Sequence, residues 1–149
     1  MATHVLTRLV VALGHEPAGG ASIAPYRDRM FSEMAREIRA IADRYGMPRE
    51  NAADLVQTLG AISVILFGPE FETRYIEGFP DEAVIRLTGC AMFGEERAST
   101  DAPAEVGSIC QAYVQHAIVA LNPDFTISIA KARCRGDPFC EMVIERRRP

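Results

Sequence analysis

The chain has 149 residues, of which 16 are Lys or Arg and 20 are Asp or Glu, so its formal net charge is -4. A chain of this length is the size of one domain and buries enough surface to be stable without a disulfide or a metal. Its acidic balance, with no basic block except Arg146–Arg148, argues against nucleic acid as a partner. We therefore expect a single domain over residues 1–149.

The apolar segment Val5–Leu13 is too short to span a membrane and contains Arg8. It also lacks the charged leader and the small-residue cleavage site of a signal peptide. We expect a cytoplasmic protein with no membrane partner, in a compartment where thiols stay reduced. The four cysteines are then expected to be metal ligands, catalytic groups or core residues rather than disulfides: Cys90, Cys110, Cys134 and Cys140.

Helices are predicted in the first half of the chain. The segment Thr3–Leu13 fits a short helix or a buried strand, and a loop follows it. From Tyr26 to Tyr45, apolar residues recur every three or four positions, and Gly46 is expected to end this helix. The recurring residues are Met30, Met34, Ile38 and Ile41 or Ala42. A second helix is expected to open at Pro48; its second half, "AISVILF", is apolar all round, which is typical of a helix in the middle of a domain.

The pattern changes after Pro69. The segments "ETRYIEGF" and "EAVIRLTGC" are rich in β-branched residues and predict an antiparallel hairpin. A helix is expected from about Pro103 to Leu121, followed by a second pair of strands, "FTISIAKARC" and "FCEMVIERR", which alternate apolar and polar residues. The predicted fold class is α+β, with the N-terminal helices and the later helix packed on one side of a four-stranded antiparallel sheet.

Three of the cysteines are expected to converge. Cys134 and Cys140 flank a Gly-Asp-Pro turn, and Cys110 lies on the helix face that must pack on the sheet. A disulfide, a metal clip and a set of inert buried thiols are all compatible with this pattern. Cys90 ends the strand "VIRLTGC" at the rim of the sheet, where a reactive thiol or a packed one would fit. Asp137 is either a turn former that binds local backbone amides or a catalytic acid or base.

Several common catalytic patterns do not occur in the sequence. The chain contains no Gly-rich phosphate loop, no Gly-x-Ser-x-Gly elbow and no His-Glu-x-x-His pair. Phosphoryl transfer, serine hydrolase chemistry and zinc protease chemistry are therefore not predicted.

Three stretches of the second half together resemble a known family: "RLTGC" at 86–90, "ICQAYVQHAIVALNPDF" at 109–125 and "CRGDPFCEMVI" at 134–144. They are similar to the 2-aminothiazoline-4-carboxylate hydrolase family, in which a strand-ending Cys precedes a helix-borne Cys with a following Asn-Pro and a final Gly-Asp-x-x-Cys. More distantly, they resemble vinyl-4-reductase domains, which serve as ligand sensors in some bacterial regulators. The resemblance covers about residues 84–145.

The resemblance implies a ligand pocket between helices and sheet, and it implies a zinc site. In zinc-containing members of the vinyl-4-reductase group, the ligands are a helix Cys, a Glu and two hairpin cysteines; Cys110, Cys134 and Cys140 match three of them. The Glu position falls near Lys131, which is a poor ligand. The chain departs from the family pattern at this position.

Two functions follow from this resemblance. The first is a hydrolase that opens a thiazoline-like C=N bond with metal-activated water or with Cys90 as the nucleophile and Asp137 as the proton donor. The alternative is a non-enzymatic small-molecule-binding or sensor domain with a structural zinc clip. Helix faces rich in Ala, Ile and Val would also suit a homodimer.

Overall fold

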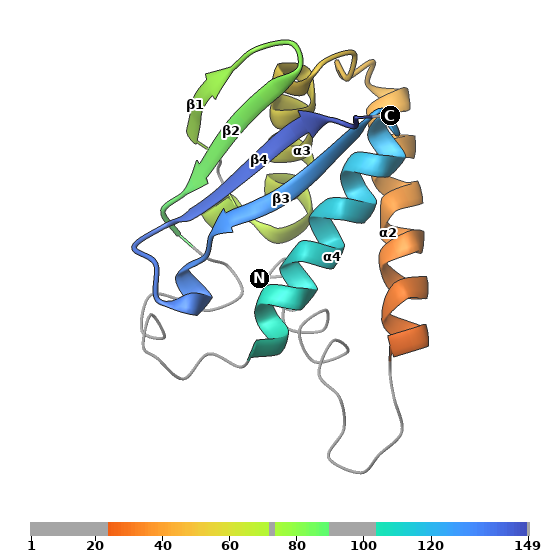
Figure 1. The fold of residues 1–149 in the computed structure, drawn as a ribbon. Helices are drawn as coiled ribbons and strands as arrows, with labels where there is room; N and C mark the ends of the chain where they lie inside the picture. Colours follow the sequence, from red (N-terminus) through yellow and green to blue (C-terminus); the bar gives the residue numbers. More distant parts are fainter. Residues whose placement is uncertain (1–23, 72–73, 90–103, 149) are drawn as a thin grey trace.

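The computed structural model describes residues 24–71, 74–89 and 104–148, and Figure 1 shows how their elements are arranged. The predictions for Thr3–Leu13 and the loop after it lie outside these residues. The described helices and strands, in chain order, are α2 (Ala24–Arg44), α3 (Ala52–Phe67), η1 (Pro69–Phe71), β1 (Arg74–Gly78), β2 (Glu82–Leu87), α4 (Ala104–Leu121), β3 (Phe125–Lys131), η3 (Arg133–Arg135) and β4 (Cys140–Arg146).

The strands form one antiparallel sheet in the order β1-β2-β4-β3. Both predicted hairpins are present, and the sheet is completed where β2 pairs with β4. Alternate residues of β2 are buried, at Ala83, Ile85 and Leu87. The same alternation buries Phe125 and Ile127 on β3, so one face of the sheet forms the core.

The fold is α+β, but the predicted packing of all helices on a four-stranded sheet is wrong in two respects. The body of the sheet is the three-stranded antiparallel unit β2-β4-β3. Strand β1 adds only five residues at one edge, and a bulge between Tyr75 and Glu77 breaks its register with β2. In addition, α3 and α4 cover the sheet, whereas α2 packs mainly against α4 (Figure 1).

The buried stripe of α2 matches the predicted one in the second half of the helix and differs from it in the first half. The prediction used Met30 and Met34, which are only partly buried. The side chains that α2 buries are Phe31, Ala35, Ile38 and Ala42. Two of them are alanines, and small residues let two helices approach closely. The predicted positions Ile38 and Ala42 are therefore confirmed, whereas in the first half of α2 the buried positions are Phe31 and Ala35 rather than Met30 and Met34.

Gly46 ends α2, as predicted. Its φ angle of 59° lies in the left-handed region, which glycine adopts without steric cost. The amide of Gly46 donates to Asp43 O and that of Met47 donates to Ala42 O. These two bonds form a Schellman cap, which satisfies carbonyl groups that the end of a helix would otherwise leave unpaired.

Helix α3 begins at Ala52 rather than at the predicted Pro48. The side chain of Asn51 accepts a hydrogen bond from the amide of Asp54 at 2.9 Å, and the Asp54 carboxylate accepts one from the amide of Glu50 at 3.1 Å. These reciprocal bonds cap the first turn, so Asn51 sets the start of the helix. The residues before it form a linker that is fixed to α4.

Helix α4 lies at the centre of the domain, between α2 and β3 (Figure 1). Its buried residues recur at helical spacing, as predicted: Ile109, Tyr113, Val114, Ala117, Ile118 and Leu121. The ring of Tyr113 meets that of Phe67 edge to face at 5.0 Å, and its hydroxyl lies 2.9 Å from Ser63 Oγ. A buried polar pair therefore joins α3 to α4 inside the apolar core.

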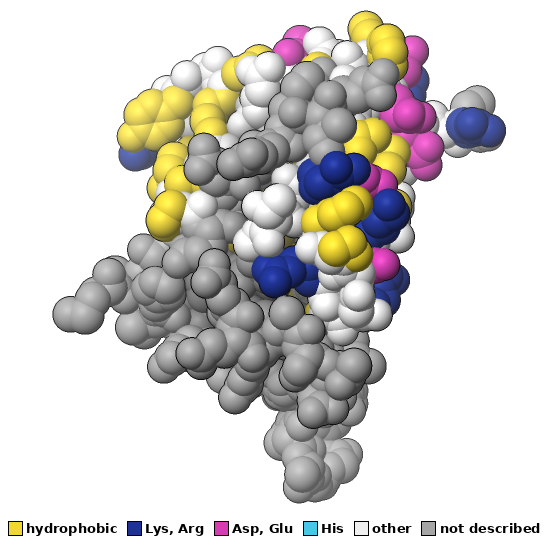
Figure 2. Space-filling model, turned by 90° about the vertical axis from the view of Figure 1, so that its left-hand side faces the viewer, with side chains coloured by type: hydrophobic (Ala, Val, Ile, Leu, Met, Phe, Trp, Pro, Cys, Tyr) yellow, Lys and Arg dark blue, Asp and Glu magenta, His cyan; other side chains and the backbone are white. Residues whose placement is uncertain are grey.

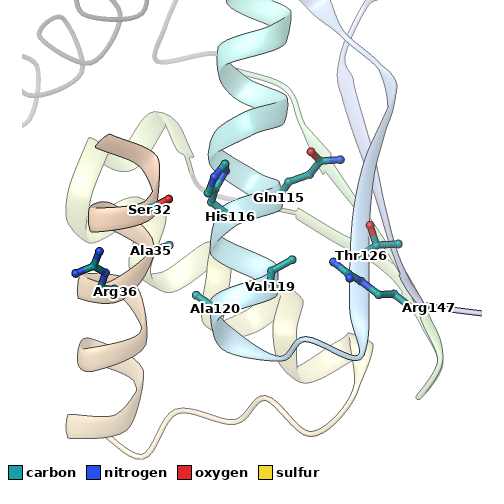
Figure 3. Close-up of a pocket in the computed structure, with 9 residues that line it drawn as sticks. All are labelled: Ser32, Ala35, Arg36, Gln115, His116, Val119, Ala120, Thr126 and Arg147. Carbon is teal, nitrogen blue, oxygen red and sulfur yellow. The ribbon is translucent and has the colours of Figure 1, made fainter. Parts of the chain in front are cut away.

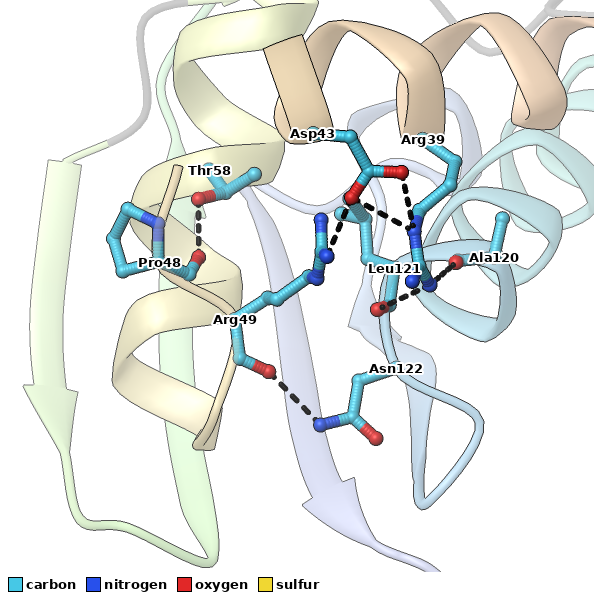
Figure 4. A network of polar contacts seen from close by, with 8 residues as sticks. All are labelled: Arg39, Asp43, Pro48, Arg49, Thr58, Ala120, Leu121 and Asn122. Carbon is cyan, nitrogen blue, oxygen red and sulfur yellow. Dashed lines mark hydrogen bonds and ion pairs between the residues drawn. The ribbon is translucent and has the colours of Figure 1, made fainter. Parts of the chain in front are cut away.

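A polar network fixes the C-terminal end of α4 to α2 and to the linker before α3 (Figure 4). Arg39 Nη1 donates to the carbonyl oxygens of Ala120 and Leu121 at 2.9 and 3.3 Å, two groups that a helix end leaves unpaired. Asp43 accepts from Arg39 and pairs with Arg49, and these partners, Arg49 first, lower the pKa of the Asp43 carboxyl. Asn122 Nδ2 donates to Arg49 O at 2.9 Å.

We predict that Tyr113→Phe destabilises the protein by about 1–3 kcal/mol, because it leaves the buried Ser63 hydroxyl without this partner. The double variant Tyr113→Phe with Ser63→Ala removes both polar groups and should recover part of that loss. Urea unfolding of the single and double variants measures the coupling between the two side chains. If the effects of Tyr113→Phe and Ser63→Ala on the free energy of unfolding simply add in the double variant, the two side chains are not coupled and the prediction is wrong.

We predict that Arg39→Met lowers the free energy of unfolding by about 1–2 kcal/mol, since it removes the charged donor from the end of α4. The matched control is Arg36→Met on the same helix. Arg36 makes an exposed ion pair with Glu33, so its loss should cost less than about 0.5 kcal/mol. Chemical denaturation compares the two variants, and equal effects would refute the role of Arg39.

Candidate functional site

The structure brings the predicted hairpin cysteines into the same region. Cys134 lies in η3 and Cys140 begins β4, and both side chains are partly buried. A Cβ atom on Gly107 would lie 3.6 Å from Cys134 Sγ, so η3 packs against the first turns of α4. Cys110, also partly buried, follows one turn later on the same helix. The predicted proximity of the hairpin to α4 is therefore found.

These thiols do not form a metal-binding group. Among the residues that the structure describes, which include Cys110, Cys134 and Cys140, no cluster of three or more His, Cys, Asp or Glu side chains is placed to hold a metal ion. Cys140 Sγ instead accepts a hydrogen bond from the amide of Arg133 at 3.3 Å. We therefore assign no chemical step to zinc.

Lys131, which stands near the position of the family's Glu ligand, has another contact. Its Nζ lies 4.8 Å from the centre of the Phe139 ring, and the guanidinium of Arg86 lies 3.9 Å from the same centre. Arg86 also pairs with Glu141 at 2.8 Å across the β2-β4 ladder. These cation-π and ionic contacts brace the hairpin next to the cysteines.

The two predicted catalytic residues have different outcomes. The carboxylate of Asp137 accepts a hydrogen bond from the amide of Ala132 at 2.8 Å, which is the turn-forming role considered for it. Gly136, with a φ angle of 95°, provides the left-handed position that this turn needs. Cys90 lies outside the described residues, so its catalytic role stays a prediction.

We predict that Cys134 is alkylated more slowly in the folded protein than in urea. Burial raises the pKa of the Cys134 thiol, and the neighbouring Cys140 raises it further, so less of the reactive thiolate is present at neutral pH. Mass spectrometry after timed iodoacetamide treatment at pH 7.5 measures the rate for each peptide. In Cys140→Ser the Cys134 rate should rise, and faster labelling of folded wild type would contradict this account.

A groove of about 500 Å³ lies on the outer surface of α4, and its described lining includes no cysteine. Figure 3 shows its lining side chains, which come from both sides of α4. Polar and small apolar residues from four segments share it: Ser32, Ala35 and Arg36 from α2, Gln115, His116, Val119 and Ala120 from α4, Thr126 from β3, and Arg147. Its size is that of a small-molecule site.

Two of the groove's polar side chains are oriented by backbone carbonyl groups. Arg147 Nε donates to Phe125 O at 3.2 Å, so its terminal nitrogens are the donors left for a ligand. His116 Nδ1 lies 2.8 Å from Ala112 O, and because a carbonyl oxygen only accepts, Nδ1 carries the proton. Nε2 is then the ring nitrogen available to the groove.

Side chains also cover the outer edge of β3 beside the groove. Gln111 donates through Nε2 to Ile127 O at 3.1 Å and accepts at Oε1 from the Ile129 amide at 3.2 Å. Arg135 donates to Ile129 O at 3.2 Å, and Arg147 bonds Phe125 O as described above. Together these residues occupy backbone groups that an edge strand would otherwise offer to another chain.

The sequence did not predict this groove. Its residues are scattered from Ser32 to Arg147, and none belongs to a recognised catalytic motif. One signal was available: Gln111, Gln115 and Val119 recur at spacings of four on α4, which places two amides and an apolar side chain on one exposed helix face. In the sequence, Arg147 stands out only as part of the basic segment Arg146–Arg148, which fits either a charged tail or a site for a carboxylate ligand.

The described elements define an α+β domain in which a helix-flanked groove adjoins the sheet edge. Among solved structures, the fold is similar to that of a trafficking protein particle complex subunit 3 from Naegleria fowleri covalently bound to palmitic acid, with a TM-score of 0.63. The two chains are 12% identical, and the match covers 99% of this chain and 96% of that one. At this identity the similarity shows a shared fold.

Comparisons of sequence give no further assignment. No family model matches the chain. A search of curated proteins also finds no match. The resemblance to the thiazoline carboxylate hydrolases therefore stays a prediction. None of the described helices is long and apolar enough to cross a membrane.

Proposed function

We propose that the protein is a non-enzymatic small-molecule-binding domain whose ligand lies in the groove over α4. The observation that carries this proposal is the groove itself, which has a volume of about 500 Å³ and combines apolar and polar side chains. Ligand sites typically have volumes of about 300–1,000 Å³ and a small number of orienting polar groups. Both properties are found here.

The polar groups of the groove favour binding over catalysis. The described lining residues include no Asp, Glu or Cys. His116 is oriented by the Ala112 carbonyl rather than by a carboxylate, so the groove lacks the acid that normally supports a catalytic histidine. The arrangement can orient a bound molecule, and it offers no assembled nucleophile and base.

The structural neighbour supports a small-molecule function for this fold. That trafficking particle subunit is described as covalently bound to palmitic acid, so a protein with the same architecture carries an acyl chain. We infer that the present chain also accepts a ligand with an apolar part. In this protein the proposed site is the groove, and no covalent bond to the ligand is required.

Among the described residues, no contact favours the hydrolase hypothesis. Asp137 binds the Ala132 amide, and the described thiols form no metal-binding group. Thiazoline ring opening at Cys90 and a role for zinc remain predictions.

A second proposal is that the protein forms a homodimer. Ligand binding in the groove does not depend on it. The similar trafficking subunit belongs to a complex, and in the present chain Ile65 on α3 exposes 63% of its surface. Light scattering on wild type and Ile65→Lys would test this surface.

The binding proposal predicts that Val119→Trp abolishes ligand binding. Val119 is 39% exposed, so the larger side chain should fill the groove without entering the core. The matched control is Ile65→Trp, at an exposed position on α3 outside the groove. Compounds that raise the melting temperature of wild type should fail with Val119→Trp and persist with Ile65→Trp.

Backbone amide NMR provides a direct test of the location. Bound compounds should shift the resonances of Ala120 on α4 and Thr126 on β3, which both line the groove. Shifts confined to other elements, or hits that Val119→Trp leaves intact, would refute the groove as the binding site.

A further inference from the structure

We propose that the groove selects amphiphilic anions, which are molecules with one anionic head group, such as a carboxylate, and an apolar body. This inference rests on the proposed binding function and specifies its ligand. It is carried by the charges of the lining side chains, by the geometry of Arg147 and by the apolar surface between the polar groups.

The charge of the groove is opposite to that of the chain. The whole protein has a net charge of -4, whereas the described groove residues include two arginines and no acidic side chain. On the face drawn in Figure 2, by contrast, basic and acidic side chains are interspersed. A local excess of positive charge in an acidic protein favours an anionic ligand at this position.

Arg147 is positioned to receive the head group. Its backbone amide donates to Asp124 O at 2.8 Å, and its Nε donates to Phe125 O at 3.2 Å. Both bonds orient the guanidinium while its terminal nitrogens remain as donors. A planar pair of such donors matches a carboxylate in shape and charge. Thr126, next to Phe125 on β3, adds a hydroxyl group to the same side of the groove.

The α2 side supplies a second cation that can be released. Arg36 Nη2 lies 3.0 Å from Glu33 Oε1, and the two side chains are 72% and 55% exposed. Exposed pairs of this kind contribute little to stability, so Arg36 can exchange Glu33 for a ligand at small cost.

The surface between the two arginines is apolar and shallow. Ala35, Val119 and Ala120 provide it, and Val119 is the most exposed of the three. Two small alanines leave room for a chain or ring of a ligand to lie against α4. A molecule with an apolar body and one anionic end therefore meets complementary groups along the groove.

The test compares three probes with the same ten-carbon tail: decanoate, decanol and decylammonium, each below the concentration at which it forms micelles. Calorimetry at pH 7 on the full chain gives the affinities. Non-specific attraction to an acidic protein favours the cation, so a tenfold preference for decanoate over both other probes would support the proposal. Equal affinity for decanoate and decanol would overturn anion selection and leave the binding function intact.

Variants show which side chains cause the preference for decanoate. Arg147→Gln and Arg36→Gln should each weaken decanoate binding, by about tenfold for Arg147→Gln, and leave decanol unchanged. Arg148→Gln removes the same charge at the next position, outside the described lining, and should have little effect. An equal loss in Arg148→Gln would overturn the proposal, because it would trace the preference to overall charge. Failure of all three probes in wild type, with hits of other chemistry that Val119→Trp abolishes, would overturn this inference alone.

Discussion

Helix α4 packs on the core, on α2 and on the edge of β3, and the rest of the structure depends on these three contacts. One face carries Tyr113 and the other buried residues that pack into the core. Another face packs on α2, where the ring of His116 lies 6.1 Å from that of Phe31, and Gln111 meets the edge of β3. The remaining surface, with Val119, is exposed and becomes the floor of the groove. The groove exists because α2 and β3 flank a helix that is not covered by a third element among the described residues.

The sequence predicts those parts of the fold that a local repeat determines. The alternation in β2 and β3 and the helical spacing in α4 each reflect burial against a single large surface, and both predictions are confirmed. The start of α3 depends on side-chain bonds of Asn51 and Asp54, which competed in the sequence with the helix-opening signal of Pro48. On α2 the sequence predicted the buried Ile38 and Ala42 correctly, but it placed the first half of the stripe one position before the buried Phe31 and Ala35. The weak β1 edge also could not be predicted from its β-branched residues.

For the candidate sites too, the sequence predicts what local structure determines and misses what tertiary packing determines. Spacing around a short turn correctly placed Cys134 near Cys140, because a hairpin is a local structure. It could not show that the Arg133 amide binds Cys140 or that Lys131 faces Phe139, since both contacts depend on the path of η3. The groove joins residues more than a hundred positions apart, from α2 to Arg147. Such a site becomes recognisable only after α2 and α4 are placed side by side, where Arg39 holds the end of one helix to the other.

Arg147 has two tasks that a single substitution cannot separate. One nitrogen covers the Phe125 carbonyl at the outer edge of β3, and the others lie at the groove. Bare strand edges recruit other strands and lead to aggregation, and Gln111 protects the neighbouring part of the same edge. A substitution at position 147 would therefore change both ligand selectivity and resistance to aggregation. A lineage that altered its ligand by changing this residue would also have to find another way to keep its sheet from joining those of other copies.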